Sequence, residues 1–529
     1  MSDRTRHWKV DLAAAAFAAG AVIALPLWLV LGRHSWFAQD EWDFLAARKA
    51  GDLGDLFRGH NVHWVTLPVL VYRFLYWTFG LRSYLPYRLV VVVLHLVAAT
   101  LLLIVMRRAA VRPWIATAAA TLFVFLGSGW QNIVQPFQIC FTGALAFGLV
   151  HLLLADHDGA MQRRDAFGLL AGLLGMMCSG VGVTMVGVVG LAVLLRRGWR
   201  PALVHTVPLA ACYLVWLVAI GHGGYGGTHP TFHGVFGFVA IGLRASYREI
   251  GQIPGLGVTL AVVLGAGLAL AWNQRRDSAQ RVALAAPVAL LTGSVVFLAI
   301  TATGRLILGS GTAGSSRYVY IVAAMTIPAL AVAADAVTTR WRWFFPIAIV
   351  LFLVGIPANI SALRDAERSQ RASALTTRRM MLTLPRVPAA TRVPRSLVPD
   401  PLTARQVTIG WLLDGVAQHR IPSPGTLSRL DRASDNFRLS FDQRPQASPT
   451  TSCFTLKRAT RITLEPGDVI GLSGNVIRVL PASGQSSFLG PPLQFAPTGD
   501  PIAIVNAPGP VSLRPFFYPA RICIRPAPS

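Results

Sequence analysis

The chain has 529 residues, 53% hydrophobic and 13% charged, whereas soluble domains carry about 25% charged residues. Its apolar residues are clustered: Leu89–Met106 and Phe344–Leu363 contain no formal charge, and about 20 such residues cross a bilayer. The formal charge of +25 does not indicate nucleic acid, because most basic residues before position 360 lie in short gaps between apolar runs. These features exclude a soluble protein and a nucleic-acid partner.

Hydropathy predicts a mainly α-helical, polytopic transmembrane bundle of about eleven spans. We place them near 11–32, 85–106, 114–127, 135–154, 166–178, 180–195, 202–220, 255–272, 282–302, 319–337 and 343–358. The first apolar segment lacks a small-residue cleavage site, so we interpret it as a retained anchor.

The distribution of arginine predicts the orientation of these spans. With a cytoplasmic N-terminus, each of five cytoplasmic gaps contains at least two arginines, as the positive-inside rule requires. The gaps are Arg107–Arg112, Asp156–Asp165, Arg196–Arg200, Gln274–Arg281 and Thr338–Arg342. We therefore expect an inner (plasma) membrane protein whose first long loop, 33–84, and C-terminal part are extracytoplasmic.

Two aromatic segments are predicted to be amphipathic helices at the membrane surface rather than spans. Val62–Gly80 contains Arg73, and counting it as a span would reverse every later loop. Phe232–Gln252 receives the same interpretation.

Residues 359–529 are predicted to form an extracytoplasmic β-sandwich-like domain, separate from a membrane module at 1–358. Gly and Pro punctuate short β-type runs at Arg461–Leu464, Asp468–Leu472, Val476–Leu480 and Ile502–Val505. This part holds 21 Lys and Arg against 10 Asp and Glu. The excess favours contact with anionic membrane lipid or glycan, or simply an arginine-biased surface.

The five cysteines divide into two groups. Cys140, Cys178 and Cys212 lie in apolar segments and are expected to be packing residues. Cys453 and Cys523 lie in the C-terminal part, where an oxidising compartment makes a disulfide between them plausible.

Three carboxylates, Asp40, Glu41 and Asp43, follow the first predicted span. Acids at the membrane surface are costly unless they face water, a cation or a substrate. Crowded carboxylates raise one another's pKa, which suits a general base. The alternative is an interfacial loop with ordinary solvated acids.

This acidic motif resembles that of the GT-C glycosyltransferases, which include protein mannosyltransferases, aminoarabinose transferases and arabinosyltransferases. The architecture is also similar: about eleven spans, amphipathic helices in the first long loop and an extracytoplasmic C-terminal domain. The resemblance implies a polyprenyl-phosphate sugar as donor. It also implies that Asp40 is the base that activates the acceptor hydroxyl and Glu41 the second acid, and Asp43 is an additional carboxylate.

His60 and His63 lie further along the same loop. Their i, i+3 spacing would place both imidazoles on one face of a helix, where they could contact phosphate or assist proton transfer. Polar anchoring at the interface is the alternative, and no third zinc ligand is near.

Arg305, Arg317 and Tyr318 belong to the outer loop before the tenth predicted span. Arginine pairs two phosphate oxygens through its planar fork, and the resemblance places a basic residue near the donor phosphate. Snorkelling of the arginines towards water is the alternative. Gln131 and Gln138 surround another outer helix junction, where amides line a polar cavity or form interhelical hydrogen bonds.

These residues predict a membrane glycosyltransferase of the cell envelope. It would move a sugar from a polyprenyl phosphate to a glycan, lipid or protein acceptor, and it would serve cell wall biosynthesis. No cofactor is required, although a divalent metal could bind among the carboxylates, and no phosphate-cradling glycine loop indicates a nucleotide donor. The rival is a lipid or polysaccharide transporter or flippase, although the predicted spans are nearly free of acids.

Overall fold

The computed structural model describes residues 11–49, 51–221, 231–275, 277, 281–444, 447–450, 452–484, 492–497, 499–516 and 518–527. The chain divides into two compact units. The first comprises Met1–Arg33, Phe57–Pro68 and Tyr87–Glu367, and the second comprises His34–Leu56, Val69–Pro86 and Arg368–Ser529. This division differs from the predicted domains 1–358 and 359–529, because most of the loop 33–84 groups with the C-terminal part.

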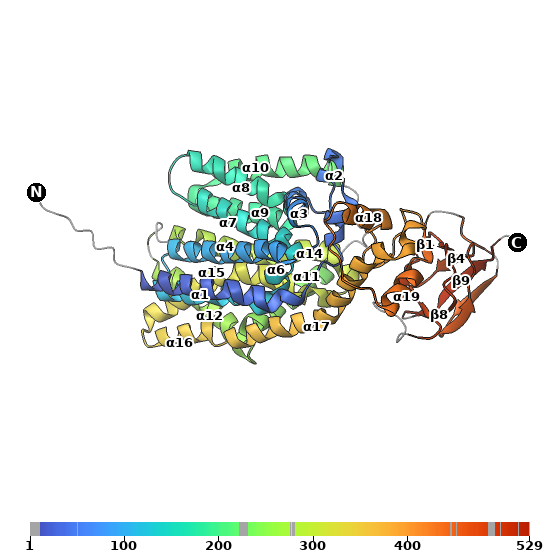
Figure 1. Cartoon of the computed structure of the whole chain (residues 1–529). Helices are drawn as coiled ribbons and strands as arrows, with labels where there is room; N and C mark the ends of the chain where they lie inside the picture. The colour runs from blue at the N-terminus through green and yellow to red at the C-terminus, as the bar shows by residue number, and fades with distance from the viewer. Residues whose placement is uncertain are drawn as a thin grey trace, which may run out of the picture. The chain divides into compact units, whose positions relative to one another are not determined.

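The first unit is a bundle of helices that run side by side (Figure 1). Its helices are α1 (Leu12–Leu31), α4 (Leu85–Arg108), α5 (Pro113–Val124), α6 (Trp130–Val134), α7 (Ile139–Ala155), α8 (Arg163–Met176), α9 (Gly180–Arg197), α10 (Trp199–Trp216), α11 (Phe232–Gly251), α12 (Leu256–Gln274), α14 (Ala285–Arg305), α15 (Ser316–Arg340), α16 (Phe344–Leu353) and the start of α17 (Ile356–Thr383). Short helical turns extend or connect several of them, including η3 (Gly127–Gly129), η4 (Pro136–Gln138), η5 (Leu217–Gly221), η6 (Leu306–Leu308) and η7 (Ser310–Gly314).

In the described part of the chain, nine helices are long and apolar enough to cross a membrane, or up to ten if a bent helix pair counts as one span. The pair is Pro113–Val124 with Gly127–Val134. The chain is therefore a multi-pass membrane protein. The segment predicted as a span at 166–178 forms α8, which has only 14 residues and does not qualify.

Helix α15 is the centre of the bundle. Every residue from Tyr318 to Ala334 is buried, and many of them are alanine. Small side chains let neighbouring helices approach closely, so an Ala-rich helix is suited to this position. Because α15 begins at Ser316, Arg317 and Tyr318 lie in its first turn.

Both segments predicted as amphipathic helices are helical. The first is α3 (Thr66–Phe79), and the second is α11, which buries Phe238, Gly242, Ser246 and Ile250 at four-residue intervals. This spacing places the buried residues on one face of the helix. Their position at a membrane surface stays a prediction.

The second unit ends in two antiparallel sheets that pack over one apolar core. The strands are β1 (Phe441–Gln443), β2 (Cys453–Leu456), β3 (Thr460–Thr463), β4 (Val469–Ser473), β5 (Ile477–Pro481), β6 (Leu493–Phe495), β7 (Ile502–Ile504), β8 (Pro510–Pro515) and β9 (Ala520–Arg525). The sheet orders are β1-β7-β4-β9-β2 and β3-β8-β5-β6. All four predicted β-type runs are strands.

Three helices occupy much of the segment before the sheets, and the sequence did not predict them beyond residue 358. α17 continues to Thr383, and α18 (Ile409–Ala417) and α19 (Arg429–Arg438) follow. Two further short helices, η2 (Asp43–Ala47) and α2 (Leu53–Phe57), lie in the first long loop. α19 begins with a capping box in which Ser428 and Asp431 each accept from the other's backbone N–H.

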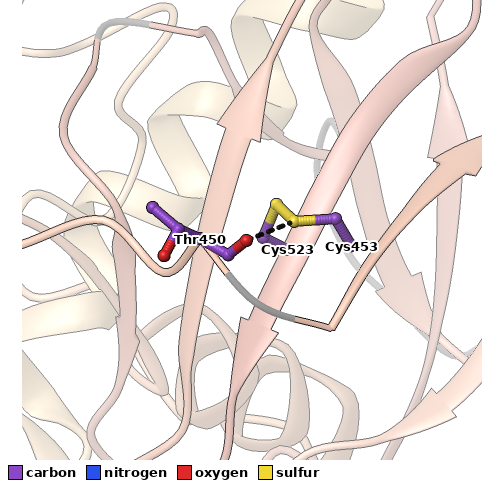
Figure 2. The surroundings of a disulfide bond; sticks show 3 residues. All are labelled: Thr450, Cys453 and Cys523. Atoms are coloured by element: carbon purple, nitrogen blue, oxygen red, sulfur yellow. Dashed lines mark hydrogen bonds between the residues drawn. A yellow bond between two sulfur atoms is a disulfide. The ribbon is translucent and has the colours of Figure 1, made fainter.

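A disulfide joins Cys453 of β2 to Cys523 of β9, the pair that the sequence suggested (Figure 2). The two cysteines are direct partners in the β2–β9 ladder. The Sγ of Cys453 also lies 3.3 Å from the carbonyl oxygen of Thr450. The bond ties an edge strand of the five-stranded sheet to its neighbour.

We predict that Cys453→Ser/Cys523→Ser lowers the stability of the β-sandwich by about 3–5 kcal/mol, since the bond closes a 70-residue loop. Pulse proteolysis of the full chain across a urea series measures this loss. Reductant should reproduce the loss in the wild type and change nothing in the double variant. An equal effect of reductant on both proteins would contradict the prediction.

Candidate functional site

A pocket of about 250 Å³ opens in the first unit, between the helices and a turn of the first long loop. Most of its wall is apolar or aromatic, and its polar side chains include those of His63, Thr184 and Arg305. The other lining residues are Asn61, Val62, Phe141, Gly180, Val181, Val183, Tyr213, Phe297, Ile300, Thr301, Thr303, Gly304 and Tyr318. Apolar walls with few polar groups are typical of ligand pockets.

The sequence predicted that His60 and His63 share one face of a helix, and this prediction is wrong. The two residues flank a tight turn. Each backbone N–H donates to the other residue's carbonyl at 2.9 Å. The residues between them, Asn61 and Val62, have φ of 47° and 65°. Positive φ at both central positions is typical of a type I′ hairpin turn, and such strain in a β-branched residue points to a constrained site.

The imidazole of His63 lies on the pocket wall against the start of α9. A Cβ at Gly180 would lie 2.9 Å from His63 Nδ1, so only glycine leaves room for the ring. Burial, and then the positive charges of Arg305, His60 and Arg317, lower the pKa of His63 to about 4. His63 is therefore neutral at pH 7, with one ring nitrogen that donates a hydrogen bond and one that accepts.

Arg317 lies in the first turn of α15, next to the pocket. Its guanidinium lies 5.2 Å from the ring centre of Tyr318, and its charge acts on His63. Gln131 braces this turn: its Oε1 accepts from the backbone N–H of Arg317, and its own N–H donates to Ser316 Oγ. The structure therefore brings together His63, Arg305, Arg317, Tyr318 and Gln131 in one region.

Several buried polar atoms near this region lack a partner among the described residues. They include Arg317 Nε, the hydroxyl of Thr184 and Gln138 Oε1, although Gln138 does not line the pocket. Asn132, fully buried in α6, has no partner for either side-chain polar atom. Buried polar groups are normally hydrogen-bonded, so these atoms indicate that water or a ligand supplies the missing partners.

In the second unit, Glu41 is buried and accepts several hydrogen bonds. Tyr72 donates its hydroxyl to Oε1 at 2.7 Å, Tyr84 approaches both carboxylate oxygens within 3.0 Å, and the N–H of Ala38 donates to Oε2 at 2.9 Å. Glu41 is 4% exposed. This carboxylate holds the first loop together and is poorly placed to meet a large acceptor.

Asp43 forms an ion pair with Arg48 at 2.8 Å, and the side chain of Arg48 is fully buried. Arg48 also donates to the carbonyl of Asp55, and Arg73 donates to the carbonyl of Arg48. Asp43 thus belongs to a structural network. Asp40 is half-buried in the turn before η2, where its carbonyl accepts from the N–H of Asp43.

Among the described residues, no group of three or more His, Cys, Asp or Glu is arranged to hold a metal ion. The carboxylates that the sequence offered as ligands are partly engaged, since Glu41 meets two tyrosines and Asp43 meets Arg48. A divalent metal here stays a prediction.

The sequence did not reveal a buried cluster around Asp165 at the start of α8. Its carboxylate accepts from Arg197 at 2.7 Å and lies 3.0–3.1 Å from His205 and His157. His205 in turn lies 3.1 Å from His151. The cluster ties α7, α8, α9 and α10 together. Its members come from different helices, so no local spacing could have predicted it.

Comparisons with known proteins identify no relative: no family model, no curated protein and no solved structure matches the chain. The chain is defined by its fold and pocket as a multi-pass membrane protein with a β-sandwich.

We predict strong coupling between Glu41 and Tyr84, because removing either one takes a buried hydrogen bond away from the other. Glu41→Ala should destabilise the second unit by about 1–3 kcal/mol. The double variant Glu41→Ala/Tyr84→Phe should be more stable than the sum of the single changes predicts, by about 0.5–3 kcal/mol. Urea unfolding of the four proteins measures this coupling, and strict additivity would argue against it.

A second prediction concerns pH. The unfolded chain binds a proton at His63 near pH 6.5, and the folded protein binds it only near pH 4. Stability should therefore fall as pH drops from about 6.5 to about 4. Thermal midpoints across this range should fall less steeply in His63→Gln than in the wild type. Parallel pH profiles would mean that His63 is not held neutral.

Proposed function

We propose that this protein is a membrane glycosyltransferase that takes a sugar from a polyprenyl-phosphate donor and transfers it to an envelope acceptor. The observation that carries the proposal is the pocket of the first unit, where apolar walls end in cationic and hydrogen-bonding side chains. A lipid phosphate matches this pocket, because its apolar chain suits the apolar walls and its anionic phosphate suits the cationic and hydrogen-bonding side chains.

The arginines next to this pocket support a phosphate as the polar part of the ligand. Arg305 lines the pocket, and Arg317 carries a buried Nε that has no partner in the described part of the chain. Guanidinium groups bind phosphate oxygens in pairs, and such charge-assisted bonds are stronger than neutral ones. The neutral His63 and the hydroxyl of Thr184 add two further hydrogen-bonding groups on the wall.

The proposed reaction breaks the bond between the anomeric carbon and the phosphate oxygen, and it forms a bond from that carbon to the acceptor oxygen. The acceptor proton passes to Asp40, the loop carboxylate that the resemblance assigns as base. The departing lipid phosphate gains one negative charge, which Arg317 and Arg305 stabilise electrostatically. Attack opposite the leaving phosphate inverts the anomeric centre.

Glu41 and Asp43 have supporting roles in this proposal. Glu41 orders the turn that carries Asp40 through Tyr72 and Tyr84, and Asp43 does so through Arg48. They are positioning residues rather than proton acceptors. The acceptor is a glycan, lipid or protein on the extracytoplasmic face, which is the side that the arginine distribution predicts for this loop.

The experiment is a transfer assay with a panel of polyprenyl-phosphate sugars and the full chain in nanodiscs. Asp40→Asn should lower kcat by about 10²- to 10⁴-fold with little change in the donor KM. Arg317→Gln should lower kcat/KM by about 10- to 100-fold, since it removes a charge-assisted contact to the leaving phosphate.

Two matched controls accompany these variants. Asp52→Asn makes the same acid-to-amide change at an exposed position of the same loop, and Arg244→Gln removes an exposed arginine of α11. Both should retain activity. Full activity in Asp40→Asn, Glu41→Gln and Asp43→Asn would overturn the mechanism, and donor translocation without sugar transfer would favour the flippase.

A further inference from the structure

A second pocket, of about 390 Å³, lies within the second unit, and two arginines and a histidine line part of its wall. Arg82, Arg386 and His419 contribute to its wall, and none of the described residues that line it is acidic. The remaining lining residues are Val416, Ile421, Pro422 and Ser423. Two guanidinium groups and an imidazole from segments far apart in sequence therefore meet at this pocket, and the charge of the two arginines favours an anion.

The arginines are held at this pocket by main-chain contacts that leave donors for a ligand. Arg82 donates from one terminal nitrogen to the carbonyl of His419 at 2.7 Å, and Arg386 donates to the carbonyl of Ile421 at 3.3 Å. The buried Nε of Arg386 has no partner within the described residues. Buried polar groups are normally hydrogen-bonded, and an anion in the pocket would accept a hydrogen bond from this guanidinium N–H.

The pocket adjoins the end of α3, which carries an unpartnered apolar face. Leu70, Phe74 and Trp77 are 44%, 62% and 70% exposed, and their i, i+4, i+7 spacing puts them on one side of the helix. The chain leaves α3 through Gly80, where a Cβ would lie 2.2 Å from the carbonyl of Arg420. The N–H of Leu81 donates to that same carbonyl at 2.8 Å, so the end of α3 is anchored beside the pocket.

We propose that this pocket binds the phosphate of an anionic phospholipid headgroup while the exposed face of α3 rests in the bilayer surface. The occupant follows from two observations. The chain already spans a membrane, and an apolar helix face with aromatic residues next to basic groups is the pattern of interfacial helices. The proposal does not depend on the enzymatic activity, because none of these residues belongs to the pocket of the first unit.

Native mass spectrometry of the full chain tests the proposal, with phosphatidylglycerol and phosphatidylcholine offered in equal amounts. The wild type should retain phosphatidylglycerol preferentially. Arg82→Gln/His419→Asn should lose that preference by about 10-fold, and asparagine is chosen because His419 has a φ of 56°. The control Arg432→Gln removes an exposed arginine of α19 and should behave like the wild type.

A second measurement uses the wild-type fold and covers the case in which the double variant is unstable. The fluorescence of Trp77 is the part of the signal that is lost in Trp77→Phe. Dibrominated phosphatidylglycerol should quench this fluorescence more strongly than dibrominated phosphatidylcholine does. Equal quenching by both lipids would overturn the proposal. An unchanged lipid preference in the double variant would also overturn it. The same holds if inorganic phosphate or an anionic oligosaccharide stabilises the protein and phosphatidylglycerol does not.

Discussion

Hydrocarbon offers no hydrogen bonds to the peptide group, so a chain that crosses a bilayer repeatedly must satisfy its backbone inside helices. Polar chemistry is then confined to helix ends and the turns between them. The candidate site follows this rule: Arg305 ends α14, Arg317 opens α15, Gly180 opens α9, and His63 projects from a turn. Strain at Val62 and the absence of a side chain at Gly180 are the local adjustments that let the imidazole reach the pocket.

Long apolar runs and short β-type runs were predictable because their periodicity is local. α4, α12 and α15, for example, need no tertiary information, and four predicted runs became β3, β4, β5 and β7. The His60–His63 turn was missed, since i, i+3 spacing fits both a helix and a hairpin turn. α17 was also missed beyond residue 358, because its polar half resembles a linker by composition.

The sequence identified Asp40, Glu41 and Asp43 as a group of acids, but it could not predict which residues they contact. Tyr72 and Tyr84 are 31 and 43 residues from Glu41, and no sequence pattern links them. The structure gives two of the three neighbouring acids buried partners: Glu41 meets Tyr72 and Tyr84, and Asp43 meets Arg48. The pocket of the second unit was unpredictable for the same reason, since Arg386 and His419 meet Arg82 of the first loop there and no sequence pattern links them.

The central claim is that the first unit's pocket receives a lipid phosphate, and photoaffinity labelling tests it most directly. A polyprenyl phosphate with a diazirine near its phosphate should label the peptide Phe297–Arg305, with competition by unlabelled lipid and loss of labelling in Arg317→Gln. Labelling confined to bilayer-exposed positions such as Val258 and Val262 of α12, unaffected by competitor or by Arg317→Gln, would contradict the claim.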